Sequence, residues 1–190
     1  MIQKVETVYF DGKGKDYTEE TIRIAKKRAD ELGIKNIIVA SYTGYTGVIA
    51  SQAFKECNLS VSAGMMGFHK PNVHRMIEEN KNIIEDNGGK IFYHLHSFGG
   101  LGRAVKQKFG AIQVDEIIAN TLRIFSQGVK VALEISCMAC DAGMIKADEP
   151  CIAISGSGGG ADTAVVLSPV NTHRFFDAKV YEILCKPRIG

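Results

Sequence analysis

Short apolar runs alternate along this chain with amphipathic segments, and glycine-bearing loops follow several of the runs. Residues 37–40 form a continuous apolar run, which is typical of a parallel strand that is buried on both faces. Residues 18–32 place apolar side chains on one helical face and end before Gly33, a typical helix stop. The alternation predicts a single α/β domain over residues 1–190, built on a mainly parallel sheet.

The remaining elements follow from the same patterns. We expect further strands over residues 5–10, 59–63, 90–95, 151–155, 163–167 and 180–184. Further helices are expected over residues 48–57, from near Pro71 to the glycines at 88–89, and over 103–108 and 114–125. Residues 129–137 alternate like a strand, but the length of the apolar segment and its alanine and methionine content favour a buried helix through Met144.

Glycine makes up 20 of the 190 residues, roughly a tenth of the chain against a usual ~7%. Eleven of these glycines follow the expected strand ends, in four loops over residues 41–47, 64–70, 97–102 and 156–160. The carboxyl ends of parallel strands meet at one edge of a sheet, where ligands bind such folds. Glycine lets backbone amides approach a ligand closely. The four loops therefore predict a ligand site at this edge.

The loop over residues 41–47 carries the most chemistry. It lies between a buried strand and a helix and supplies the hydroxyls of Ser41, Thr43 and Thr46 beside the free amides of a helix N-terminus. Such an arrangement suits a phosphate monoester. The Lys followed by Ser or Thr of a Walker A loop is missing. The alternative is an ordinary strand-to-helix turn that is capped by hydroxyls.

The segments 41–47, 64–70 and 159–169 resemble the pyruvate kinase C-terminal domain family, and the resemblance extends over nearly the whole chain. It is greatest to stand-alone archaeal and bacterial members, some of which bind FMN. The resemblance implies a three-layer α/β/α sandwich with a five-stranded mixed core sheet whose last strand is antiparallel. It also implies FMN as a ligand and supports a helix over residues 129–144. The kinase catalytic domain is absent from these segments, so we do not expect pyruvate kinase activity.

FMN would occupy the four-loop edge, with its phosphate at the loop 41–47 and its ring between apolar side chains. Met65, Met66, Phe68, Phe98 and Tyr45 would supply the faces, and Lys70 or Arg103 a cation near the ring. Ser155, Asp162, Thr163 and the amides of residues 156–160 would bond the ring edge. The cofactor-binding residues expected are Ser41, Thr43, Gly44, Tyr45, Thr46, Gly47, Met66, Gly67, Phe68, Ser97, Phe98, Ser155, Gly156, Gly159, Gly160, Asp162 and Thr163. His69 and His96 are the candidates for proton transfer.

Other motifs are weaker. Residues 156–161 match the dinucleotide pattern GxGxxA, but a strand follows them where a helix is required. Ser155 and Ser157 lack the glycine spacing of a nucleophile elbow. We expect His94 and His96 on one face of a strand, where they could share a metal with His69 or Asp162. A single HxH is unspecific, and we expect no metal.

Cys137 and Cys140 form a single CxxC inside an apolar segment. A zinc ribbon needs a second pair, and a thioredoxin-like motif opens a helix directly after a strand. Buried small apolar residues are therefore favoured over a thiol pair that exchanges electrons with a flavin. The five cysteines are too sparse for a secreted disulfide scaffold and indicate reduced thiols. The basic stretch 103–108 indicates a solvated face, though it could meet an anionic ligand.

A net charge of +2 is too small to indicate binding to nucleic acid or to an anionic membrane. No signal-peptide pattern and no run of 18 apolar residues occurs, so we expect a cytoplasmic protein. Three functions remain. The first is an FMN-binding protein, with or without flavin-dependent oxidoreductase activity. The second is a non-catalytic module that senses a phosphorylated metabolite, and the third is a CxxC thiol oxidoreductase. We also expect a homo-oligomer.

Overall fold

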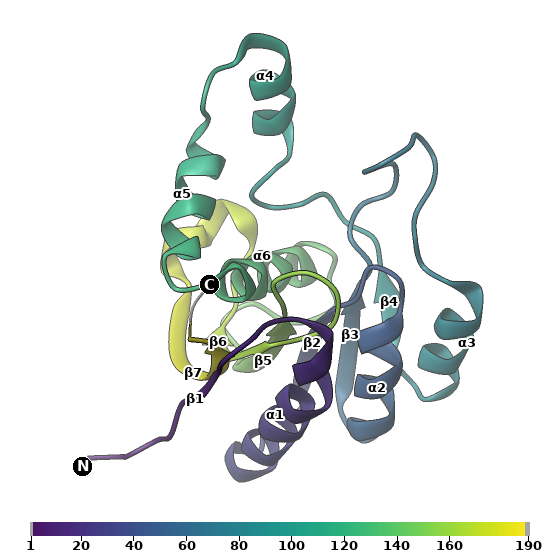
Figure 1. Ribbon diagram of the computed structural model, residues 1–190, viewed down its shortest axis with the longest axis vertical. Helices are drawn as coiled ribbons and strands as arrows, with labels where there is room; N and C mark the ends of the chain where they lie inside the picture. The colour runs from purple at the N-terminus through teal and green to yellow at the C-terminus, as the bar shows by residue number, and fades with distance from the viewer. Residues whose placement is uncertain (1, 189–190) are drawn as a thin grey trace.

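The computed structural model describes residues 2–188 and contains one seven-stranded sheet, in the order β1-β7-β6-β5-β2-β3-β4 (Figure 1). The strands are β1 (Val8–Phe10), β2 (Asn36–Ala40), β3 (Asn58–Ser62), β4 (Lys90–Phe92), β5 (Cys151–Ser155), β6 (Thr163–Ser168) and β7 (Lys179–Pro187). Neighbours β4, β3, β2 and β5 are parallel, and β6 runs antiparallel to both β5 and β7. The expected five-stranded core is thus β4-β3-β2-β5-β6, and β7 and β1 extend it.

Six α-helices connect the strands: α1 (Thr18–Leu32), α2 (Tyr45–Ala53), α3 (Glu78–Asp86), α4 (Leu101–Phe109), α5 (Val114–Arg123) and α6 (Gln127–Asp141). Two 3-10 turns lie at Lys15–Tyr17 and Thr172–Asp177. Within residues 2–188, no helix combines the length and the apolar character that crossing a bilayer requires.

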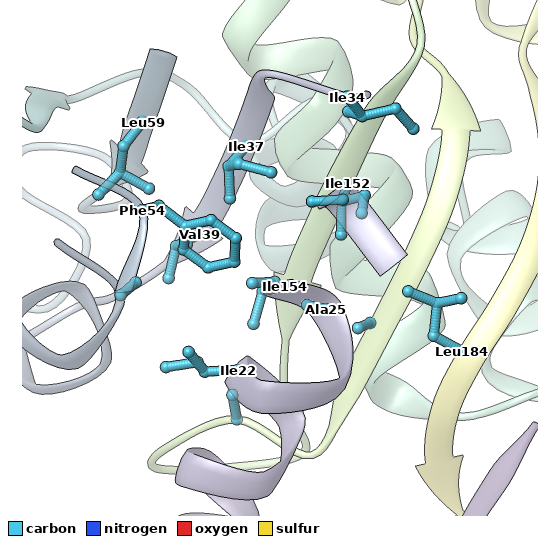
Figure 2. Packing of buried hydrophobic residues seen from close by; sticks show 14 of the residues in the cluster. Ile22, Ala25, Ile34, Ile37, Val39, Phe54, Leu59, Ile152, Ile154 and Leu184 are labelled. Carbon is cyan, nitrogen blue, oxygen red and sulfur yellow. The ribbon is translucent and has the colours of Figure 1, made fainter. Parts of the chain in front are cut away.

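Each central strand buries alternate side chains on opposite faces of the sheet. Ile37 and Val39 of β2 belong to a cluster that includes Ile22 of α1 and Phe54 beside α2 (Figure 2). Ile38 belongs to a second cluster, formed largely with α6. Because both faces are covered, β2 is apolar at almost every position, as the run in the sequence predicts. The result is a three-layer α/β/α sandwich.

Helix α6 resolves the ambiguous segment in favour of a helix. Twelve of its fifteen residues are buried. At its start, the hydroxyl of Ser126 accepts a hydrogen bond from the amide of Val129 at 3.0 Å and caps the helix. A helix that is buried nearly all round has no polar face, so its amphipathic period is lost. That loss explains why residues 129–137 look like a strand in the sequence.

Several boundaries differ from the expectations. α3 begins at Glu78 and not near Pro71, because Asn72 adopts a positive φ of 64° and the chain turns there. β4 ends at Phe92, so His94 and His96 follow the strand and do not share one of its faces. The expected helix 48–57 is α2, displaced toward the N-terminus. The strands expected at 5–10 and 180–184 are β1, which is shorter, and β7, which is longer.

Candidate functional site

The loop over residues 41–47 leaves backbone amides free at the carboxyl end of β2. The hydroxyl of Ser41 accepts a hydrogen bond from the amide of Gly47 at 3.0 Å, and so satisfies one donor of the first turn of α2. The amides of Tyr45 and Thr46, the two residues before Gly47, have no hydrogen-bond partner within the helix. The side chains of Ser41 and Thr46 are buried. The loop therefore presents two amides beside a fixed hydroxyl, a geometry that suits an oxyanion.

Gly44 allows this loop to close. It caps α2 with φ 92°, a left-handed conformation that L side chains rarely adopt. A Cβ at Gly44 would lie 2.5 Å from the Cβ of Asn80 and 2.9 Å from the sulfur of Met76. The Asn80 amide in turn donates to the carbonyl of Thr43 at 3.0 Å. The start of α3 thus holds the loop in place, and only glycine fits at position 44.

A cavity of about 610 Å³ opens beside the loop, within the size range of small-molecule sites. Segments from both faces of the sheet line it, because α2 lies on one face and α6 on the other. The lining residues are Ala40, Ser41, Tyr42, Thr43, Tyr45, Thr46, Ser62, Gly64, Phe68, His69, Arg75, His96, Arg103, Arg123, Gln127, Lys130, Val131, Glu134, Ile135, Met138, Gly156, Gly158, Gly159 and Gly160. Three of the four predicted glycine loops therefore contribute to one cavity.

An aromatic cluster forms one wall of the cavity. The ring of Phe68 lies 5.0 Å from His69, 5.0 Å from His96 and 6.2 Å from Tyr42, in edge-to-face arrangements. The guanidinium of Arg103 lies 5.0 Å from the centre of the Phe68 ring. The wall therefore offers flat apolar surface with a cation held against it.

His96 is held neutral by its surroundings. Burial lowers the pKa of its imidazole, Glu134 opposes that shift, and the cations Lys130 and Arg103 lower the pKa further. Its Nδ1 atom is buried and has no hydrogen-bond partner among the described residues. His96 also lines the cavity, and a neutral imidazole there can accept or donate one proton.

Lys130 and Glu134 form a buried ion pair in the same wall. Their side chains are 8% and 6% exposed, and the Lys130 Nζ lies 2.5 Å from Glu134 Oε2. The amide of Phe98 donates to Glu134 Oε1 at 3.2 Å. Burial lowers the pKa of Lys130, and the charge of Glu134 opposes that shift. The pair positions α6 against the segment that carries His96 and Phe98.

Three further cations line the cavity without a carboxylate partner. Among residues 2–188, Arg75, Arg103 and Arg123 form no ion pair, whereas Arg28 is held by Glu182 at 2.6 Å. Hydrogen bonds to uncharged groups orient two of them: Arg103 donates to the Gly99 carbonyl, and Arg123 to the side chains of Gln127 and Asn120. With Glu134 paired to Lys130, the cavity is strongly positive.

The glycine loop over residues 156–160 is fixed by Asp162. This carboxylate is buried and accepts hydrogen bonds from the amides of Gly14 at 2.8 Å and Ser157 at 3.0 Å, and from the hydroxyl of Thr163 at 2.8 Å. The hydroxyl of Ser155 donates to the carbonyl of Gly128 at 2.7 Å. Each of these polar side chains has its partners within the protein. They shape the loop and do not line the cavity.

The predicted site residues therefore divide into two groups. Those that line the cavity are Ser41, Thr43, Tyr45, Thr46, Phe68, Gly156, Gly159 and Gly160, together with His69 and His96. Those that do not are Gly44, Gly47, Met66, Gly67, Ser97, Phe98, Ser155, Asp162 and Thr163. Some of the second group support the first: Gly44 and Gly47 close the loop, and Phe98 packs beneath Lys130, 5.6 Å from its Nζ.

Sequence reasoning missed most of the charged lining and one amide. The residues concerned lie outside the glycine loops and are Arg75, Arg123, Lys130 and Glu134, with the uncharged Gln127. One signal was available. Lys130 and Glu134 are four residues apart within an otherwise apolar helix, and paired charges in a buried helix face call for a specific environment.

No metal-binding group is present among residues 2–188, where no three His, Cys, Asp or Glu side chains come together. The ring of His94 bonds the carbonyl of its neighbour Leu95 at 2.9 Å. His96 and His69 both contact Phe68, and that ring occupies the position between them.

The Cys137 and Cys140 thiols should resist alkylation in the folded protein. Both are buried in α6, and burial raises the pKa of each thiol to about 12. Iodoacetamide followed by peptide mass analysis should label the partly exposed Cys57 first, and the other two only in denaturant. Rapid labelling of Cys137 or Cys140 under native conditions would instead support thiol chemistry.

One comparison with known proteins bears on this architecture. The family model described as pyruvate kinase, alpha/beta domain, matches residues 19–167. The matched region runs from the first turn of α1 to the penultimate residue of β6. It includes the loop 41–47, the aromatic wall and the whole of α6.

Proposed function

The chain belongs to the pyruvate kinase alpha/beta domain family, and from that premise we propose that it binds FMN, or a closely similar phosphorylated ligand, in the cavity at the carboxyl edge of its sheet. One observation carries the proposal. A single cavity joins a loop of free amides and hydroxyls to unpaired arginines and a flat aromatic wall.

The phosphate would lie at the loop 41–47. The amides of Tyr45 and Thr46 and the hydroxyl of Thr46 can donate to its oxygens, and the N-terminus of α2 favours the negative charge. Arg75 also lines the cavity, and its charge acts on Tyr42 of the same loop. Arg75 belongs to the segment before α3, whose Ile77 amide donates to the carbonyl of Thr43. A guanidinium can bond a phosphate through two N–H groups, so Arg75 would complete the charge balance.

The isoalloxazine ring would lie along the aromatic wall. Phe68 and Tyr42 offer apolar contact, and Arg103 supplies a cation beside Phe68. Ser155, Asp162 and Thr163 have partners within the protein. The ring edge would therefore bond the backbone of residues 156–160, Gln127 and His96, which do line the cavity. The buried, unpartnered Nδ1 of His96 fits a ligand that supplies a polar atom there.

A bound flavin supplies hydride and single-electron transfer, and the protein would supply binding and proton transfer. His96 is the cavity residue best suited to hold or release a proton, because its imidazole is neutral and has one nitrogen free. Arg103 would stabilise negative charge on the ring. If the protein is an enzyme, we therefore propose a flavin-dependent oxidoreductase.

The second candidate is a non-catalytic module that senses a phosphorylated metabolite. The unpaired Arg75, Arg103 and Arg123 favour it, because three guanidinium groups match a ligand with more than one negative charge. Such a ligand would place a phosphate at the loop 41–47 but would not need to contact the aromatic wall. The two candidates share the phosphate site and differ in what fills the rest of the cavity.

We also place the protein in the cytoplasm. All five cysteines are free thiols, and four of them are buried. Disulfides form and persist in oxidising compartments and are rare in the cytosol. The free thiols therefore favour a reducing compartment.

Spectroscopy of the purified protein separates the two candidates. Purified protein, or protein incubated with added FMN and then desalted, should show visible flavin absorbance. Protein that remains colourless after this treatment contradicts the flavin proposal. The sensing module would still predict saturable binding of inorganic phosphate, competed by phosphorylated sugars.

The substitution Thr46→Val should weaken FMN binding by roughly tenfold to a hundredfold, the cost of one lost hydrogen bond to a charged group, about 1.5–3 kcal/mol. Valine has nearly the same shape, so the buried position should tolerate it. Quenching of flavin fluorescence measures the affinity. The control is Ser51→Ala, which removes a hydroxyl of α2 that bonds the Val48 carbonyl away from the loop. Equal affinities in both variants would show that the phosphate lies elsewhere.

A further inference from the structure

Residues 101–125, which we call the arm, extend from the body of the molecule (Figure 1). The arm consists of α4, α5 and their short connection. An ion pair between Lys106 and Glu116 joins the two helices, and Gly102 lies against Asp115. α4 has no buried residue, and Ala119 is the one buried residue of α5. α5 contacts the body through Ile118, Ala119 and Leu122, which pack in the cluster around α6, whereas α4 buries no side chain.

The arm exposes an unusual amount of apolar surface. Seven large apolar side chains within these 25 residues are between 53% and 83% exposed: Leu101, Phe109, Ile112, Val114, Ile117, Ile124 and Phe125. Leu101 and Phe109 lie on one face of α4, eight residues apart. Val114 and Ile117 share a face of α5. Each helix thus presents an apolar face that nothing among the described residues covers.

This exposure is unfavourable for a separate monomer. A helix of nine residues such as α4 is marginal in water by itself, and helices in proteins are stabilised mainly by packing of an apolar face. A stable interface buries roughly 800 Å² per partner, and seven large apolar side chains that are each more than half exposed can supply a large part of that area. The arm therefore offers much of the surface that a specific protein contact needs.

The charges of the arm favour a second copy as the partner. The charged side chains of α4 are all basic, and the first turn of α5 carries Asp115 and Glu116. Glu116 is paired with Lys106 within the arm, which leaves Lys108 and Asp115 to pair between copies. In a two-fold interface the same patch meets itself, so the patch must hold both charges. The arm meets that condition. Because the arm carries four basic and two acidic side chains, an anionic lipid surface is the alternative occupant, and the vesicle measurement below tests it.

We propose that the arms of two copies of this chain pack against each other, with α4 of one copy beside α5 of the other, and so form a homodimer. The assembly does not depend on the proposed ligand. The interface would nevertheless lie near the cavity, because two side chains of the arm, Arg103 and Arg123, line it.

Light scattering coupled to size-exclusion chromatography tests the proposal on the full chain. The wild-type protein should have at least twice the 20.7 kDa of one chain. Phe109→Glu and Ile117→Glu place a charge on the apolar faces and should each shift the mass to that of one chain. The control is Phe176→Glu, at an apolar position outside the arm that is even more exposed, which should leave the mass unchanged.

A wild-type protein with the mass of one chain across a concentration series overturns the proposal, whatever the variants do. A dimer that both arm variants leave intact places the interface elsewhere and also overturns it. Sedimentation with vesicles of phosphatidylcholine and phosphatidylserine gives a third measurement. If a monomeric wild-type protein co-sediments with the vesicles and Phe109→Glu does not, the arm docks on lipid and not on a second copy.

Discussion

The substitution Lys130→Met should lower the free energy of unfolding by about 3–5 kcal/mol, the typical cost of removing one partner of a buried ion pair. Glu134 would remain buried with a single hydrogen bond, from the amide of Phe98, or would have to take up a proton. Methionine nearly matches the volume of lysine, so the effect reports the lost charge and not a cavity. Urea unfolding followed by circular dichroism gives the free energy.

A matched surface pair provides the control. Lys26 and Asp30 have the same helical spacing and the same 2.5 Å separation as Lys130 and Glu134, but they are exposed. Lys26→Met should therefore cost no more than about 1 kcal/mol. The double variant Lys130→Met with Glu134→Leu should recover most of the lost stability, because neither charge remains. If Lys130→Met is as stable as Lys26→Met, the pair is not a buried support for the cavity wall.

The substitution Gly44→Ala should lower the affinity for FMN and for inorganic phosphate by at least about tenfold, equivalent to about 1.4 kcal/mol. The new Cβ would lie 2.5 Å from the Cβ of Asn80, and the residue must hold φ 92°. The loop would have to shift and carry the amides of Tyr45 and Thr46 with it. Isothermal titration with both ligands measures the loss.

Gly33→Ala separates this effect from backbone strain. Gly33 ends α1 with φ 66°, and a Cβ there would meet nothing within 4 Å. Gly33→Ala carries only the cost of the left-handed conformation, whereas Gly44→Ala adds the close contact with Asn80 and should lose more stability. Only Gly44→Ala should lose ligand affinity. Unchanged affinity in Gly44→Ala would show that the loop geometry does not determine binding.

The local parts of the site could be predicted from sequence. The run over residues 37–40 and the hydroxyl-rich loop after it are adjacent in the chain, so their strand-turn-helix geometry follows from nearby residues alone. Their placement at the carboxyl edge follows from the parallel sheet. The position of the loop 156–160 at the same cavity follows from the same rule.

The part of the cavity lining that α5 and α6 supply could not be predicted in this way. Arg123 and Lys130 reach it from α5 and α6, which lie on the opposite face of the sheet from α2. The packing of two distant helices determines that meeting, and local patterns do not encode it. Both helices of the arm could be predicted from sequence, near 103–108 and 114–125, but the exposure of their apolar side chains could not. Leu101 and Phe109 lie on one helical face, which is usually buried, yet the structure exposes them.

The role of Asp162 could not be predicted either, for a different reason. A carboxylate beside a glycine loop at a ligand edge suggests contact with the ligand, but here it binds the amides of Gly14 and Ser157. Gly14 lies 148 residues away in the chain. A buried carboxylate must find donors, and the sequence does not show whether they belong to a ligand or to a distant segment.

The most direct test of the proposed ligand compares FMN with riboflavin, which has the same ring and lacks the phosphate. Titration of the full chain, followed by flavin fluorescence, gives both dissociation constants. If the loop 41–47 and Arg75 bind the phosphate, FMN should bind at least about a hundredfold more tightly than riboflavin, because two or more hydrogen bonds to a charged group are lost. Equal affinities, or no binding of either compound, would contradict the account.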